Sequence, residues 1–277
     1  MRVIKILLWI LLPVLAAAVL AIVLSSVAEP ERGETILSFF GMRLTVTGAG
    51  AGLSFLTFLG FAGIRFARNQ NRKGKSFAFG TLADAAGFGF LPGTAVWKVY
   101  EQFTPLAAGT PVFEPLPVIG WIMQDGCFAP ARMEMILSLL CFAGIIIWLI
   151  LRKDDFSRNG DLPGVVLCLW GLVRALTESI RAVPFLHAGS INLTQILFLL
   201  AADVPLIFWT GRGWTKKKST VFTALEWIAV LSCETVLVLN TSGVLTVGSD
   251  IGDFAVNCGC TILSILVILL AGKDSRS

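Results

Sequence analysis

The sequence predicts an all-α protein, a polytopic membrane helix bundle of about eight transmembrane helices. Of its 277 residues, 56% are hydrophobic and only 14% are charged, whereas soluble domains carry about 25% charged residues. The apolar residues form long runs that do not alternate as strands do. Because lipid offers no hydrogen bonds to an open backbone, helices are the expected spanning elements.

Eight apolar runs are long enough to cross a bilayer. We expect spans at residues 6–28, 44–64, 77–98, 133–151, 163–184, 191–209, 221–239 and 254–271. The third run is the least regular, because Asp84 lies inside it and Pro92-Gly93 interrupts it. We therefore expect a broken helix there.

Basic residues assign the orientation of the spans. Most of the 22 basic residues fall in alternate loops or at the two termini: Arg2, Lys5, Arg65, Arg68, Arg72, Lys73, Lys75, Arg152, Lys153, Arg158, Arg212, Lys216, Lys217, Lys218, Lys273 and Arg276. Cytoplasmic loops are enriched in Lys and Arg, so these loops and both termini are expected to be cytoplasmic.

The N-terminus allows a second interpretation. Arg2 and Lys5, an apolar run and Ser26-Val27-Ala28 resemble a signal peptide that is cleaved after Ala28. The apolar run is about 22 residues long, whereas the apolar region of a signal peptide is about 7–15 residues. An uncleaved span is therefore the favoured interpretation.

The composition gives little support for a metal site, a cofactor site or a nucleic-acid-binding surface. Six cysteines are scattered, and the Cys258-Gly-Cys260 pair is too tight for the usual zinc spacing. His187 is the single histidine, and the net charge is only +4. We expect no metal, no cofactor and no nucleic-acid partner.

The fifth predicted span carries three charges on one expected helix face. Arg174 and Glu178 are four residues apart and Arg181 follows three residues later. A charge at mid-span costs about 2.5–3.5 kcal/mol on insertion scales, so it must face the protein interior or a wet cavity. An internal Arg174–Glu178 ion pair is one interpretation. Arg181 is not needed for such a pair, and a guanidinium is well suited to bind a phosphate headgroup.

Other polar residues could converge on this face. Glu134 opens the fourth span beside Arg132, and Gln195 lies early in the sixth span, a turn after Asn192. Together they predict a basic cavity near the outer leaflet. Gln195 alone could equally be an interfacial hydrogen-bonding residue.

Several segments match one enzyme family. Residues 170–181 read Trp-Gly-x-x-Arg-x-x-x-Glu-x-x-Arg, which resembles the Tyr-Gly-x-x-Arg-Phe-x-x-Glu-x-x-Arg signature of prolipoprotein diacylglyceryl transferases. Residues 191–197 are similar to the family's Gln-bearing helix and 129–134 to its Pro-x-x-x-Tyr-Glu helix. Residues 40–48 and 87–100 are similar to its first two helices.

This resemblance implies a lipid substrate and a membrane. The family moves a diacylglyceryl group from phosphatidylglycerol to a lipoprotein cysteine in the bacterial plasma membrane. By resemblance, Glu178 and Arg174 would be the catalytic residues. The phospholipid would be bound by Arg174, Arg181, Glu134, Gln195, Thr47 and Gly48.

Departures from the family pattern favour a binding protein over an enzyme. Thr47 stands where the family has a tyrosine, and the family's His-Gly-Gly segment has no counterpart because His187 lies in another element. Thiol transfer needs a base within hydrogen-bond reach, whereas phosphate binding needs only fixed positive donors. A non-catalytic or weakly active phospholipid-binding relative is the favoured hypothesis. An active transferase and a small transporter are the alternatives.

The resemblance also divides the chain. It implies an N-terminal transmembrane helix at residues 1–35, a diacylglyceryl-transferase-like core at 36–210 and two additional helices at 211–277. The expected partners are a phosphatidylglycerol-like phospholipid and either a lipoprotein precursor or another membrane protein.

Reporter fusions test the predicted topology. A reporter that is active only in the cytoplasm is expected to work when it is fused after Lys75, Arg158, Lys217 or Ser277. It is expected to fail near Glu114 or Ser249. Activity at Glu114 would contradict the alternation of loops and with it the eight-span interpretation.

Overall fold

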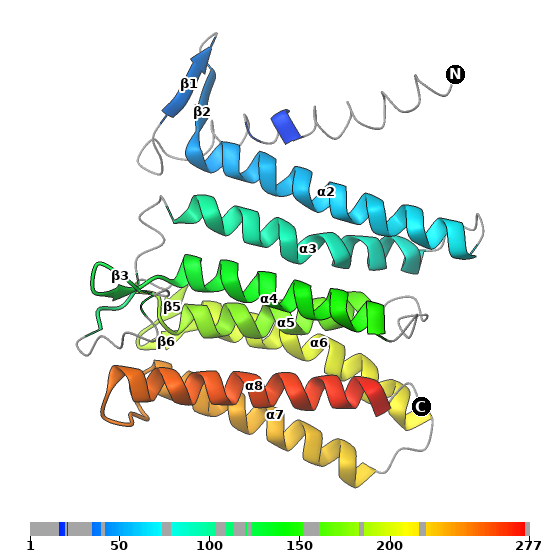
Figure 1. The fold of residues 1–277 in the computed structure, drawn as a ribbon. Coiled ribbons are helices and arrows are strands. Elements are labelled where there is room, and N and C mark those ends of the chain that lie inside the picture. The colour runs from blue at the N-terminus through cyan, green and yellow to red at the C-terminus, as the bar shows by residue number, and fades with distance from the viewer. Residues whose placement is uncertain are drawn as a thin grey trace. The chain divides into compact units, whose positions relative to one another are not determined.

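The computed structural model describes residues 17–19, 21, 35–39, 42–73, 79–102, 109–112, 120, 123–151, 161–182, 186–215 and 220–274. Long helices dominate these residues, which agrees with the predicted all-α bundle (Figure 1). The helices are α2 (Val46–Lys73), α3 (Phe79–Glu101), α4 (Pro130–Leu151), α5 (Asp161–Glu178), α6 (Leu193–Thr215), α7 (Thr220–Thr241) and α8 (Asp250–Asp274). Each overlaps one predicted span, while the span predicted at 6–28 falls almost wholly outside the described residues.

Five helices are long and apolar enough to cross a membrane. They are the segments Val46–Arg68, Pro130–Ile150, Leu193–Gly211, Thr220–Thr241 and Asp250–Gly272. Large apolar side chains such as Ile150, Val221 and Phe222 are exposed on these helices, as lipid-facing residues should be. The chain is therefore a multi-pass membrane protein, while the count of eight spans stays a prediction.

The predicted break in the third span is absent. Helix α3 continues through Pro92 and Gly93 (Figure 1). Proline is tolerated in membrane helices where neighbouring groups satisfy the local backbone. Here Ser54 Oγ on α2 donates to the carbonyl of Gly93 at 2.6 Å, so α2 contributes one hydrogen bond to the backbone next to the proline.

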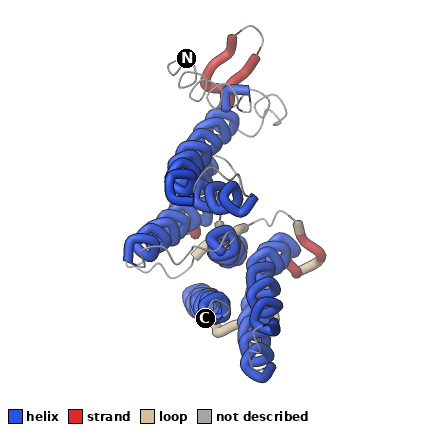
Figure 2. Tube along the Cα trace, turned by 90° about the vertical axis from the view of Figure 1, so that its right-hand side faces the viewer, coloured by secondary structure: helices blue, strands red, loops and turns tan. Residues whose placement is uncertain are grey.

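Three short antiparallel hairpins connect the helices (Figure 2). Strands β1 (Thr35–Phe39) and β2 (Met42–Thr45) lead directly into α2. Strands β3 (Met123–Gln124) and β4 (Cys127–Phe128) precede α4, and β5 (His187–Ala188) and β6 (Ile191–Asn192) join α5 to α6. The last hairpin brings the start of α6 back to the end of α5.

The chain forms two compact units. Unit 1 comprises residues 1–107 and 134–163, and unit 2 comprises residues 108–133 and 164–277. In unit 1, α2 packs closely against α3 through small residues, as membrane helices commonly do. A Cβ built on Gly89 would lie 2.3 Å from the carbonyl oxygen of Phe58. The rings of Phe61, Phe88 and Phe142 join α2, α3 and α4.

In unit 2, α7 and α8 form an antiparallel hairpin. Gly243 and Gly248 have φ values of 74° and 91° in the connecting turn, a region that favours glycine. The Asn240 side-chain amide donates to the Asn257 side chain at 3.0 Å and to the Asp253 carbonyl at 2.9 Å. These bonds tie the two helices together at the turn.

Gly89 gives a test of the α2–α3 packing. Gly89→Ala is expected to lower the free energy of unfolding by about 1–3 kcal/mol, because the added methyl group would overlap the backbone of α2. Gly60→Ala on α2 is the matched control, since nothing lies within 4 Å of its Cβ position. Denaturation in detergent measures both. An equal loss in the two variants would contradict the packing argument.

Candidate functional site

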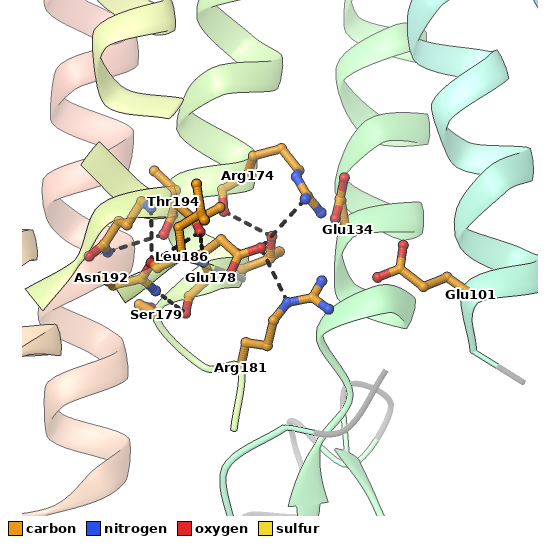
Figure 3. A network of polar contacts seen from close by, with 12 residues as sticks. Glu101, Glu134, Arg174, Glu178, Ser179, Arg181, Leu186, Asn192 and Thr194 are labelled. Carbon is orange, nitrogen blue, oxygen red and sulfur yellow. Dashed lines mark hydrogen bonds and ion pairs between the residues drawn. The ribbon is translucent and has the colours of Figure 1, made fainter. Parts of the chain in front are cut away.

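The three charges predicted around α5 meet in unit 2 (Figure 3). Arg174 Nη2 lies 3.4 Å from Glu178 Oε1, and Arg181 Nε lies 3.2 Å from the same oxygen. The side chains of Arg174, Glu178 and Arg181 are 16%, 1% and 7% exposed. The predicted ion pair is confirmed, and one carboxylate oxygen holds both guanidinium groups.

Arg181 reaches this position from outside the helix. The expectation that all three charges share one helix face is wrong for Arg181, because α5 ends at Glu178. Ser179 and Ile180 form a turn, in which Ser179 Oγ donates to the Leu176 carbonyl at 2.7 Å. Only Arg174 and Glu178 meet by helical spacing.

A strand-like segment then fixes the backbone of Arg181. Thr110 N donates to the Ile180 carbonyl at 2.9 Å, and Gly109 forms an antiparallel bridge with Arg181. Phe128 N donates to the Thr110 carbonyl at 3.0 Å on the other side. A Cβ on Gly109 would lie 2.1 Å from the Phe128 carbonyl oxygen, so this close approach requires glycine.

Asn192 and Gln195 also converge on α5, as predicted, but through its backbone. Asn192 Nδ2 donates to the Glu178 carbonyl at 3.3 Å, while its Oδ1 accepts from Gln195 N at 3.1 Å and caps α6. Gln195 Nε2 donates to the Ala175 carbonyl at 3.2 Å and to Thr241 Oγ1 at 3.1 Å. Gln195 therefore joins α5, α6 and α7, and the interfacial alternative does not describe this buried side chain.

An aromatic ring orients Arg174 from the other side. Its guanidinium carbon lies 4.6 Å from the centroid of the Phe198 ring, within the range of a cation–π contact. Trp170 packs edge-on against the same ring at 5.2 Å. The ring and the carboxylate together hold the guanidinium in one orientation.

Glu134 belongs to a second charged cluster, in unit 1. Lys98 Nζ lies 3.0 Å from Glu134 Oε2 and also pairs with Glu101. All three residues are buried. Sequence reasoning selected Glu134 but missed Lys98 and Glu101. A lysine within or at the edge of an apolar span was the signal that could have found this cluster.

The other predicted site residues have local structural partners. Thr47 and Gly48 lie in the first turn of α2, where Gly48 N donates to Thr45 Oγ1 at 3.1 Å and the helix start is capped. Arg132 donates to the Met123 carbonyl and to Gln124 Oε1, both at 3.2 Å, on the β3–β4 hairpin. A role for Thr47 and Gly48 in lipid binding stays a prediction.

The single histidine, His187, lies in the hairpin that follows α5. His187 is directly opposite Asn192 in the β5–β6 hairpin, and Asn192 contacts the last residue of α5. The His187 side chain is exposed. The register therefore places His187 opposite a residue that bonds the backbone at the end of α5.

Comparison with known proteins adds no assignment, because no protein-family model, no curated protein and no solved structure matches this chain. The function is therefore inferred from the geometry of Arg174, Glu178 and Arg181.

The shared carboxylate predicts an order of effects on stability. Glu178→Ala is expected to lower the free energy of unfolding by about 3–5 kcal/mol, because it removes the group that holds two buried guanidinium groups. Arg174→Ala is expected to cost less, since Glu178 keeps Arg181 and Arg174 is the more exposed arginine. Unfolding in detergent measures both variants. A larger loss for Arg174→Ala would contradict the central role of Glu178.

Proposed function

We propose that this protein binds an anionic phospholipid through Arg174 and Arg181, as a divergent diacylglyceryl-transferase-like membrane protein with little or no transfer activity. The observation that carries the proposal is the pair of guanidinium groups held by one carboxylate oxygen of Glu178. The three residues bring two positive charges and one negative charge to the end of α5. An arrangement of this kind suits a phosphate group.

Burial favours a guanidinium over other cations in this role. Arg181 is 7% exposed on its side chain, yet a guanidinium carries five N–H donors and loses less hydration energy than an ammonium. Its contact with Glu178 uses Nε. A planar guanidinium matches the geometry of phosphate oxygens better than an ammonium does, and the carboxylate fixes its orientation.

Binding is better supported than catalysis because of what Glu178 does. Its carboxylate contacts two cations, which suits a group that orients them more than one that accepts a proton from a thiol. Thr47, the residue at the position of the family's tyrosine, lies in the first turn of α2 in the other unit. The proposed role is therefore phospholipid recognition, with a lipoprotein precursor or another membrane protein as the partner.

An active transferase is the second candidate, and His187 is the observation that favours it. It lies opposite Asn192 in the β5–β6 hairpin, and the Asn192 side chain bonds the Glu178 carbonyl. A histidine is the commonest general base in proteins. The transporter alternative loses the support of a broken helix, because α3 is unbroken at Pro92.

Lipid retention by the purified protein tests the proposal. The protein is expected to retain phosphatidylglycerol in preference to phosphatidylcholine, as measured by native mass spectrometry. Arg181→Ala is expected to weaken phosphatidylglycerol binding about 10- to 100-fold, since a hydrogen bond to a charged group contributes about 1.5–3 kcal/mol. Arg181→Lys keeps the charge but not the planar fork, and an intermediate loss is expected.

A matched control and a turnover assay complete the test. Arg68→Ala removes one exposed positive charge from α2 and is expected to leave retention unchanged. Equal retention of both lipids, or no effect of Arg181→Ala, would overturn the proposal. Transfer to a lipobox peptide that is lost in Glu178→Gln or His187→Ala would establish the active transferase instead.

A further inference from the structure

A second pair of charged side chains meets deep inside unit 2. Asp203 on α6 lies about 15 Å from the start of that helix, and Glu234 on α7 lies about 10 Å from the end of its helix. Because the hydrocarbon core is about 30 Å thick, both residues fall well inside it. The residues are 5% and 7% exposed. They lie at one level of the α6–α7 contact, because Gln195 on α6 bonds Thr241 on α7, and Asp203 follows Gln195 by eight residues while Glu234 precedes Thr241 by seven. The two carboxyl groups interact with each other there.

The surrounding helices offer this pair no counter-charge. Residues 193–211 and 220–272, which include the apolar segments of α6, α7 and α8, contain no lysine, arginine or histidine. On α5, Arg174 is held by Glu178 and lies over Phe198, a little more than one turn before Asp203. The other acids and thiols of these helices are Asp161 and Glu178 on α5, Glu226 on α7, Asp250, Asp253 and Asp274 on α8, and Cys168, Cys233, Cys258 and Cys260.

Two carboxyl groups can form a hydrogen bond with each other only if one of them carries a proton. An ionised carboxylate only accepts hydrogen bonds, so one member of the pair must be protonated to donate. Asp203 Oδ1 and Glu234 Oε1 are buried and receive no hydrogen bond from the described residues. Two bare carboxylates in contact at this depth would repel each other strongly. A proton between them removes one charge and supplies the missing donor.

We propose that Asp203 and Glu234 form an intramembrane proton-binding site, in which the two carboxyl groups share one proton at neutral pH. This site is separate from the arginine cluster on α5 and does not depend on the proposed lipid binding. Acidic pairs inside membrane proteins commonly belong to proton relays or ion pathways.

The backbone of α6 next to Asp203 can move when the proton leaves. Pro205 lies inside α6 and has no N–H, so the carbonyl of Ala201 cannot receive the usual helical bond. Asp203 lies in the turn between these residues. Loss of the shared proton would leave two negative charges at the contact of α6 with α7, and the weakened turn is the part of α6 that can move most easily. Proton release is therefore expected to loosen this helix contact.

A carbodiimide tests for the proton directly. Dicyclohexylcarbodiimide adds the O–H of a protonated carboxylic acid across its C=N bond and does not react in this way with a carboxylate. Full-length protein in detergent micelles is treated at neutral and at alkaline pH, and peptide mass spectrometry locates the adduct. We expect an adduct on Asp203 or Glu234 at neutral pH and a loss of that adduct at alkaline pH. Absence of an adduct from both residues at neutral pH would overturn the proposal.

Matched variants show whether the two acids act as a pair. In Glu234→Gln, labelling of Asp203 is expected to be lost at a lower pH than in the unaltered protein, because the amide carries no negative charge to strengthen proton binding at Asp203. Glu226→Gln changes another acid of α7 and is expected to leave the labelling of the pair unchanged. An unchanged pH dependence of Asp203 labelling in Glu234→Gln would contradict the shared proton. Protection by sodium ions at constant pH would assign the site to a metal cation instead.

Discussion

A charge placed among lipid-facing helices must find its counter-charge inside the protein, and this constraint shapes both units. Water cannot reach such a group, and leaving it unpaired costs several kcal/mol. In unit 2 a single carboxylate, Glu178, holds Arg174 and Arg181. In unit 1 a single ammonium, Lys98, holds Glu134 and a second acid. Each unit therefore contains a compact cluster of paired charges.

Meeting this constraint requires loops as well as helices. Arg181 follows the end of α5, and it reaches Glu178 because the backbone at Ile180 and Arg181 pairs with residues 109–110. Asn192 then bonds the Glu178 carbonyl from the next hairpin. The connecting segments thus fix the orientation of charged side chains, and they can do so only where Gly109 admits the close approach of Phe128.

Features that depend on neighbours in sequence could be predicted, while those that depend on distant segments could not. The helices follow from the apolar runs, and the Arg174–Glu178 pair follows from the four-residue spacing on one helix. The continuity of α3 through Pro92 could not be predicted from α3 alone, because α3 packs against a distant segment, α2, whose Ser54 bonds the Gly93 carbonyl beside the proline. Likewise the charge of Lys98 is evident in its span, but nothing nearby identifies Glu134 as its partner.

Trp209 couples three distant parts of unit 2. Its buried ring packs where a Cβ on Gly164 of α5 would lie 3.1 Å away, and where one on Gly272 of α8 would lie 2.9 Å away. One indole ring thus fills space that both glycines leave open. A larger residue at either glycine is compatible with this packing only if Trp209 is replaced by a smaller residue or its ring moves. During evolution these three positions, spread over more than a hundred residues of sequence, are therefore expected to vary together, as contacting residues generally do.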